Sequence, residues 1–166
     1  MQPARKLRRR RICQRRRLRY ASDCSGYDGC ALALKYLGQL FIHVFASELD
    51  DRYACVFRSA HPDCQTLYRD VTTRCCSKLK QVHGGLDLYV AGFPCQPWSN
   101  IGKKLGALDA EGRGLVGYHI LMTIQALLPS AFILENVAGL CSASNGEFFI
   151  EMLEFLIGLG CYEVHW

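Results

Sequence analysis

A cysteine and a glutamate stand in settings suited to covalent chemistry. Cys95 lies in the segment Gly92-Phe93-Pro94-Cys95-Gln96-Pro97, directly after an apolar run of strand length. A cysteine between two prolines is rigidly presented and has no place inside a strand, which is the setting that a nucleophilic thiolate needs. Glu135 closes another apolar run, where a carboxyl group is costly unless it is paired or functional. We therefore expect Cys95 as a nucleophile and Glu135 as a general acid.

Three further features suit a nucleoside-type cofactor. The stretch Asp23-Cys24-Ser25-Gly26-Tyr27-Asp28-Gly29 is a tight glycine turn before a helix, and it lets a ligand approach the backbone. Glu48 follows about twenty residues on, where acids typically accept hydrogen bonds from ribose hydroxyls. Asp70 could accept from an exocyclic amine. Taken singly, the stretch could be a plain turn, Glu48 a solvated acid at a helix N-terminus and Asp70 an ordinary loop acid. The turn and Glu48 together favour a nucleoside cofactor.

The elements that must position these residues alternate along the chain. Apolar residues at helical spacing predict helices over about 30–37, 50–60, 116–128 and 149–156. Strand-like runs occupy 41–47, 66–69, 86–92, 131–136 and 162–166, and the runs at 86–92 and 131–136 look buried on both faces. This alternation predicts an α/β fold with a doubly wound, mostly parallel sheet. Ligands of such sheets bind beyond the carboxyl ends of the strands, where the residues above lie.

One internal stretch breaks the alternation. Residues 96–114 contain four glycines and show no hydrophobic period. A segment of this length without regular structure is usually a functional lid or binding loop, although a surface insertion has the same composition.

Charge divides the chain into a tail and a body. Residues 1–20 contain ten Lys or Arg and no acid, whereas residues 21–166 contain ten basic and fifteen acidic residues. We expect a disordered basic tail over 1–20, used for nuclear import or nucleic-acid binding, and a single domain over 21–166. An organellar transit peptide, a bacterial cytoplasmic protein and a mis-assigned gene start are the alternatives. No run of about 18 apolar residues occurs, so no membrane-spanning helix is expected.

The ten cysteines do not indicate a disulfide framework or a metal site. No secretory signal precedes them, and no CxxC pair with zinc-ligand spacing is present. Most of them are expected to be small buried apolar residues. His83 and His119 lack a clear partner for cysteine-protease chemistry, which is therefore disfavoured.

The motifs DCSGYDGCALALKYLG, SELD, RDVT, GFPCQPWS, GRG and ILENVAGL resemble, in order and spacing, those of the cytosine carbon-5 methyltransferases, over residues 22 to about 140. The resemblance implies the Rossmann-like fold and the cofactor S-adenosylmethionine. It implies that Gly26 and Gly29 form the cofactor turn, that Glu48 holds the ribose, and that Leu49 and Asp70 meet the adenine. It also implies that Cys95 adds to carbon 6 of a cytosine while Glu135 contacts the ring nitrogen and the exocyclic amine.

The matching positions form two sets. Cofactor contacts are expected from Ser25, Gly26, Gly29, Glu48, Leu49, Asp70, Val71, Pro94 and Leu115. Nucleic-acid contacts are expected from Gln96, Ser99, Lys103, Lys104, Arg113 and Asn136. No metal is expected.

The chain departs from the family in three respects. Asp28 stands where many relatives have glycine, and Phe93 where many have a first proline. The strand before the glycine turn, LRYAS, is poorly apolar. The later motifs of the family, including the target-recognition region, are absent, so we expect a fragment, a chain completed by a second polypeptide, or a non-catalytic protein.

The sequence thus predicts a DNA (cytosine-5) methyltransferase catalytic fragment. A tRNA cytosine-5 methyltransferase and a non-catalytic cofactor- or nucleic-acid-binding remnant are the alternatives. An NAD-type Rossmann enzyme is disfavoured, because G-x-G-x-x-G does not occur.

Overall fold

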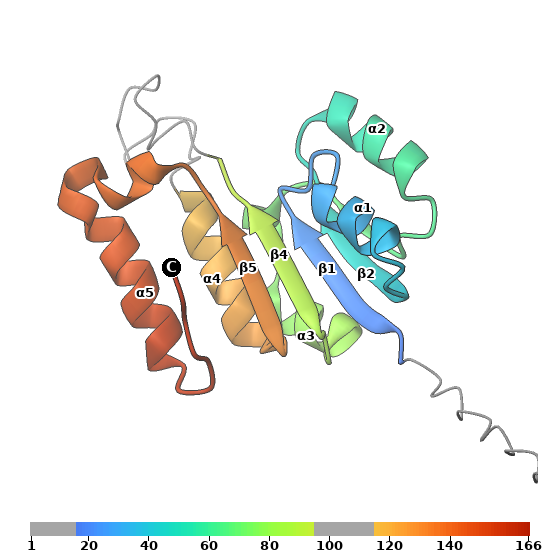
Figure 1. Cartoon of the computed structure of the whole chain (residues 1–166). Helices are drawn as coiled ribbons and strands as arrows, with labels where there is room; N and C mark the ends of the chain where they lie inside the picture. The colour runs from blue at the N-terminus through green and yellow to red at the C-terminus, as the bar shows by residue number, and fades with distance from the viewer. Residues whose placement is uncertain (1–15, 95–114) are drawn as a thin grey trace, which may run out of the picture.

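The computed structural model describes residues 16–94 and 115–166. Its centre is a five-stranded, all-parallel sheet of order β3-β2-β1-β4-β5 (Figure 1). The strands are β1 (Leu18–Asp23), β2 (Phe41–Ser47), β3 (Leu67–Tyr68), β4 (Leu88–Gly92) and β5 (Ala131–Glu135). The helices are α1 (Gly29–Tyr36), α2 (Asp51–Ala60), α3 (Cys76–His83), α4 (Val116–Leu127) and α5 (Glu147–Gly158), with short 3₁₀ turns η1 (Val71–Thr73), η4 (Ala138–Cys141) and η5 (Ala143–Gly146).

The topology is that of a doubly wound sheet. β1 is central and pairs with β2 on one side and with β4 on the other, so the chain changes direction across the sheet between β3 and β4. Figure 1 shows α1 and α2 on one face of the sheet and α3 and α4 on the other. The predicted α/β fold is confirmed. The change of direction at β1 and β4 is where such sheets bind ligands.

The main core lies between the sheet and the helices α3, α4 and α5. Tyr89 of β4 and Ile120 and Ile124 of α4 are completely buried there. α5 packs beside α4 and contributes Phe148, Met152 and Leu156 to the same cluster. Its acidic residues Glu147, Glu151 and Glu154 are exposed, as its sequence pattern predicts.

Two predictions about strands are wrong. β5 is not buried on both faces, because it lies at the edge of the sheet, where Ile133 is 52% exposed. Residues 162–166 do not form a strand. Tyr162 instead packs edge-on against Phe132, with ring centroids 4.9 Å apart, and donates a hydrogen bond to the Pro129 carbonyl at 2.7 Å, so side-chain contacts rather than a backbone ladder hold this segment.

The described part of the chain begins earlier than the predicted body. β1 starts at Leu18, and the Arg16 guanidinium pairs with Asp87 at 2.6 Å, so the last residues assigned to the tail belong to the fold. Residues 1–15 of the predicted tail lie outside the described residues. Within the described ranges, no helix is long and apolar enough to cross a membrane.

The prediction that most cysteines are buried is also wrong for those that the structure describes. The half-buried ones are Cys24, Cys30, Cys64 and Cys76, and the exposed ones are Cys55, Cys75, Cys141 and Cys161. All eight of these described cysteines are free thiols.

Candidate active site

The glycine turn after β1 has an unusual backbone. Cys24, Gly26 and Asp28 all have positive φ, of 51°, 52° and 53°. Glycine adopts this conformation without strain, whereas a side chain with a β-carbon does not. A β-carbon added at Gly26 or Gly29 would meet no atom within 4 Å, so the turn leaves open space beside its backbone. That space is what a closely approaching ligand needs.

Glu48 lies against this turn. Its Oε2 accepts a hydrogen bond from the Gly26 N–H at 2.7 Å, and its Oε1 accepts one from the Asp50 N–H at 2.9 Å. The carboxylate therefore joins the turn after β1 to the start of α2, and both oxygens retain lone pairs for a ligand hydroxyl. Sequence reasoning placed Glu48 at this edge, and the structure adds that it also fixes the turn.

A cavity of about 120 Å³ opens beside Glu48. Its lining combines carboxylates with apolar side chains and the backbone of the strand ends. The lining residues are Cys24, Ser47, Glu48, Leu49, Arg69, Asp70, Val71, Pro94 and Val116. Five of the predicted cofactor contacts (Glu48, Leu49, Asp70, Val71 and Pro94) thus converge, and the predicted Leu115 lies one residue from Val116 and is 47% exposed.

Asp70 caps the turn η1 at the rim of this cavity. Its Oδ1 accepts from both the N–H and the hydroxyl of Thr72, at 2.8 and 2.7 Å. Both described bonds use the same oxygen, so Oδ2 is available to an amine donor. Leu49 is 65% exposed beside it, which provides an apolar surface for a flat ring. Carboxylates, an apolar surface and an open glycine turn fit a nucleoside cofactor.

Asp28 forms a buried network that sequence reasoning missed. Its carboxylate accepts hydrogen bonds from the Tyr20 hydroxyl at 2.6 Å, the Ser22 hydroxyl at 2.8 Å and the Ala31 N–H at 2.9 Å. His43 Nε2 lies 3.4 Å from the same carboxylate. Asp28 therefore caps α1 and joins it to β1 and β2. The departure from glycine at this position was the only signal of such a role.

Glu135 and Asn136 lie at the carboxyl end of β5, next to the last residues before Cys95. Glu135 is exposed, so the cost expected for a carboxyl group at the end of an apolar run does not arise there. A β-carbon at Gly92 would lie 3.3 Å from Glu135 Oε2, so the glycine lets the carboxylate lie close to β4. Phe93, Glu135 and Asn136 line a second cavity, of about 160 Å³, at this edge.

Several predicted residues cannot be placed. Cys95, Gln96, Ser99, Lys103, Lys104 and Arg113, and the predicted lid over 96–114, lie outside the described residues. Pro94 is described and lines the first cavity. Within the described ranges, no group of three His, Cys, Asp or Glu side chains could hold a metal ion.

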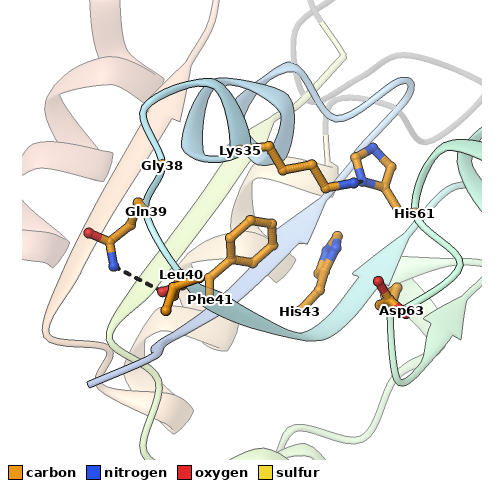
Figure 2. A pocket seen from close by; sticks show the side chains of 9 residues that line it. Lys35, Gly38, Gln39, Leu40, Phe41, His43, His61 and Asp63 are labelled. Atoms are coloured by element: carbon orange, nitrogen blue, oxygen red, sulfur yellow. Dashed lines mark hydrogen bonds between the residues drawn. The ribbon is translucent and has the colours of Figure 1, made fainter. Parts of the chain in front are cut away.

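Another pocket, of about 310 Å³, lies at the amino-terminal end of β2 rather than at the carboxyl ends of the strands (Figure 2). Lys35 and His61 reach toward each other across it, and Phe41, the first residue of β2, and His43 form its floor (Figure 2). No predicted site residue lines this pocket. Ligands of parallel α/β sheets bind at the carboxyl ends of the strands. We therefore assign the candidate active site to that end of the sheet, where Glu48 and Glu135 lie.

Comparison with known proteins shows which family the chain resembles. The family C-5 cytosine-specific DNA methylase matches residues 18–166. The type II methyltransferase M.PspPI of Psychrobacter sp. (strain TA137) is 33% identical over 137 residues, which are 82% of this chain and 31% of that protein. The type II methyltransferase M.Sau96I of Staphylococcus aureus is 32% identical over 142 residues, which are 86% of this chain and 32% of that protein. The chain thus spans about a third of the length of these relatives.

A solved structure shares the fold. The crystal structure of S. pombe Dnmt2 methyltransferase superposes with a TM-score of 0.61 at 20% identity, over 84% of this chain and 40% of that chain. The Rossmann-like methyltransferase fold is confirmed. The match over residues 18–166 shows that this chain belongs to the C-5 cytosine-specific DNA methylase family.

Proposed function

We propose that this chain is the cofactor-binding and catalytic part of an enzyme that methylates carbon 5 of cytosine in DNA. The family match over residues 18–166 carries the proposal. The convergence of Glu48, Leu49 and Asp70 on one cavity at the carboxyl edge of the sheet supports it. The relatives reported above are named as type II methyltransferases, and this chain spans about a third of their length.

The cofactor of the proposal is S-adenosylmethionine, which supplies an activated methyl group. The ribose hydroxyls would donate to Glu48, the adenine amine to Asp70, and the adenine ring would lie on Leu49. Ser25, Gly26 and Gly29 would face the rest of the cofactor across the open side of the turn. These assignments account for the free Asp70 oxygen and for the absence of β-carbons beside the turn.

The cytosine chemistry is assigned to Cys95 and Glu135. The Cys95 thiolate would add to carbon 6, which makes carbon 5 nucleophilic and divides one difficult step into easier ones. Glu135 would contact the ring nitrogen and the exocyclic amine during this addition. A cytosine within a duplex must leave the base stack to be reached. Gln96, Ser99, Lys103, Lys104 and Arg113 would then contact the nucleic acid.

A nuclear location has no support from the comparisons. The curated relatives reported above come from bacteria, so the bacterial cytoplasm fits them better. The basic residues 1–15 would act as a sequence-independent attachment to phosphates, a role that does not depend on the compartment.

A covalent trap tests the proposal. The full chain is incubated with S-adenosylmethionine and either DNA or tRNA that contains 5-fluorocytosine, since fluorine at carbon 5 prevents release of the cysteine. We expect a denaturation-resistant adduct with DNA that Cys95→Ser abolishes. An adduct with tRNA alone would change the substrate to RNA. No adduct from folded wild-type protein, as judged by circular dichroism, would contradict catalysis by this chain on its own.

A further inference from the structure

A buried ion pair contacts a residue that lines the proposed cofactor cavity, because its aspartate accepts a hydrogen bond from Ser47. It joins Asp23, the last residue of β1, to Arg74, which follows η1 and is 51 residues away in the sequence. Arg74 Nη1 donates to Asp23 Oδ1 at 2.7 Å, and Nη2 donates to Oδ2. The Arg74 side chain is 5% exposed and the Asp23 side chain is 0% exposed. The pair is therefore bidentate and removed from solvent.

Other contacts of the pair reach the strands and helices around it. Asp23 also accepts from the Ser47 hydroxyl of β2 at 2.7 Å and from the Tyr89 hydroxyl of β4 at 2.6 Å. The Arg74 guanidinium lies over the Phe45 ring, 5.3 Å from its centroid. It also reaches the Thr123 hydroxyl of α4 at 3.3 Å. One ion pair thus joins β1, β2, β4 and α4.

Both walls of the cofactor cavity depend on these contacts. On one side, the Ser47 hydroxyl that donates to Asp23 also accepts from the Cys24 N–H at 3.4 Å, and the Ser47 carbonyl accepts from the Ser25 N–H at 2.9 Å. On the other side, Arg74 directly follows the turn that Asp70 caps. Cys24, Ser47 and Asp70 all line the cavity. The ion pair therefore fixes how far apart the two walls lie.

Stability alone does not explain such a pair. Removing two charges from water costs about as much as their attraction returns, and apolar residues of similar volume often serve stability equally well or better. Burial opposes the charge on Arg74, and its pKa is nevertheless raised because the Asp23 carboxylate outweighs that cost. The bidentate pair fixes the orientation of its two side chains relative to each other, and an apolar cluster does not.

We propose that Arg74 is a positioning residue of the cofactor site, which acts through Asp23 and Ser47 on the glycine turn and through its own backbone on the Asp70 loop. The inference rests on the proposed function for the identity of the cofactor. The arrangement of the walls is independent of that identity.

A stability-matched variant separates positioning from packing. Asp23→Leu/Arg74→Met/Tyr89→Phe replaces the polar cluster by apolar side chains of similar volume, and Arg74→Lys keeps the charge but loses the bidentate geometry. Arg58→Met on the exposed side of α2 is the matched control. Three quantities are measured for each full-length variant: the Tm, the Kd for S-adenosylmethionine by calorimetry, and amide exchange in the peptide that covers residues 23–26.

We expect the triple variant to keep a Tm near that of the wild type, to bind the cofactor about three- to tenfold more weakly, and to exchange faster at residues 23–26. Arg74→Lys should show the same changes to a smaller extent, and Arg58→Met none. Wild-type affinity and exchange in folded triple and Arg74→Lys variants would overturn the inference. Wild-type protein that does not bind S-adenosylmethionine would overturn the proposed function, while exchange at residues 23–26 would still report whether the pair fixes the turn.

Discussion

The side-chain amide of Asn136 donates a hydrogen bond to the backbone carbonyl of Phe93 at 3.0 Å. Its Oδ1 accepts from the Val137 N–H at 2.9 Å, so both ends of the amide are used within the chain. Phe93 precedes Cys95 by two residues, and Asn136 directly follows Glu135. One side chain thus holds together the two backbone segments that carry the proposed catalytic residues.

Asn136→Asp should slow formation of the Cys95 adduct with little loss of stability. The carboxylate still accepts from Val137, but it can no longer donate to Phe93, and two acceptors then face each other. We expect a loss of about 1 kcal/mol in the free energy of unfolding and a decrease of about tenfold or more in the rate of adduct formation on 5-fluorocytosine DNA. Gln125→Ala, at an exposed position of α4, is the control. An unchanged rate would show that the bond to Phe93 does not align the two segments.

Glu48→Ala should weaken cofactor binding and also loosen the glycine turn. The substitution removes the acceptor of the Gly26 and Asp50 N–H groups as well as the proposed ribose contact. We expect the Kd for S-adenosylmethionine to rise about tenfold or more and the free energy of unfolding to fall by about 1–2 kcal/mol. Glu48→Gln retains one acceptor oxygen and should fall between Glu48→Ala and the wild type. Calorimetry and urea denaturation measure the two effects, and Glu154→Gln on the exposed face of α5 should change neither.

Local patterns predicted much of this structure because they report on short-range physics. The apolar spacing around Ile120 and Ile124 gave a helix, and Pro129 ended it near the observed boundary. Glu48 and Asp70 were placed at one edge because parallel strands bring their carboxyl ends together. The predicted strand at 162–166 was wrong, because an apolar run does not show whether a neighbouring strand has backbone groups to pair with it.

The buried polar networks could not be predicted, because they join residues far apart in the sequence. In the sequence, Asp23 stands at the end of a strand and Arg74 in a loop, and nothing in either segment indicates the other. Only the fold brings the two side chains into contact. Asp28 was recognised as unusual, but its partners Tyr20, Ser22 and His43 come from two strands. Edge exposure of β5 is likewise a property of the assembled sheet rather than of the run AFILE.

Acid should destabilise the fold through His43. Burial lowers the pKa of His43 to about 4, with the nearby charges of His61 and Lys35 acting in the same direction and Asp28 opposing them. In the unfolded chain the His43 side chain binds a proton near pH 6.5, whereas in the folded chain it binds one only near pH 4. The stability that the neutral His43 contributes is therefore fully present above pH 6.5, and it is lost as the pH falls toward 4. We expect a loss of about 1–3 kcal/mol across this range.

Urea denaturation between pH 7 and pH 4 measures this loss. His43→Phe should make the dependence shallower, because an aromatic ring without a titrating group keeps the contacts with Tyr20 and Phe57. A smaller slope should remain from His83, whose pKa is lowered by burial and by the charges of Arg19 and Arg74. Gln125→Ala, at an exposed and non-titrating position of α4, should leave the dependence unchanged. Equal slopes for wild type and His43→Phe would exclude His43 as the source.

Gly117 in the first turn of α4 should not tolerate even a methyl group. A β-carbon there would lie 2.5 Å from Cζ of Phe148 in α5, so either the Phe148 ring or one of the two helices must shift. A Gly-to-Ala change in an exposed helix gains about 1 kcal/mol, whereas overpacking a core costs about 1–3 kcal/mol. We expect Gly117→Ala to lower the free energy of unfolding, and Gly117→Ala combined with Phe148→Leu to recover part of the loss. Gly158→Ala, at the last residue of α5 with no atom within 4 Å of the added β-carbon, is the matched control and should be neutral or stabilising. If Gly117→Ala proved as stable as Gly158→Ala, α4 and α5 would not be packed as closely as the contact between Gly117 and Phe148 requires.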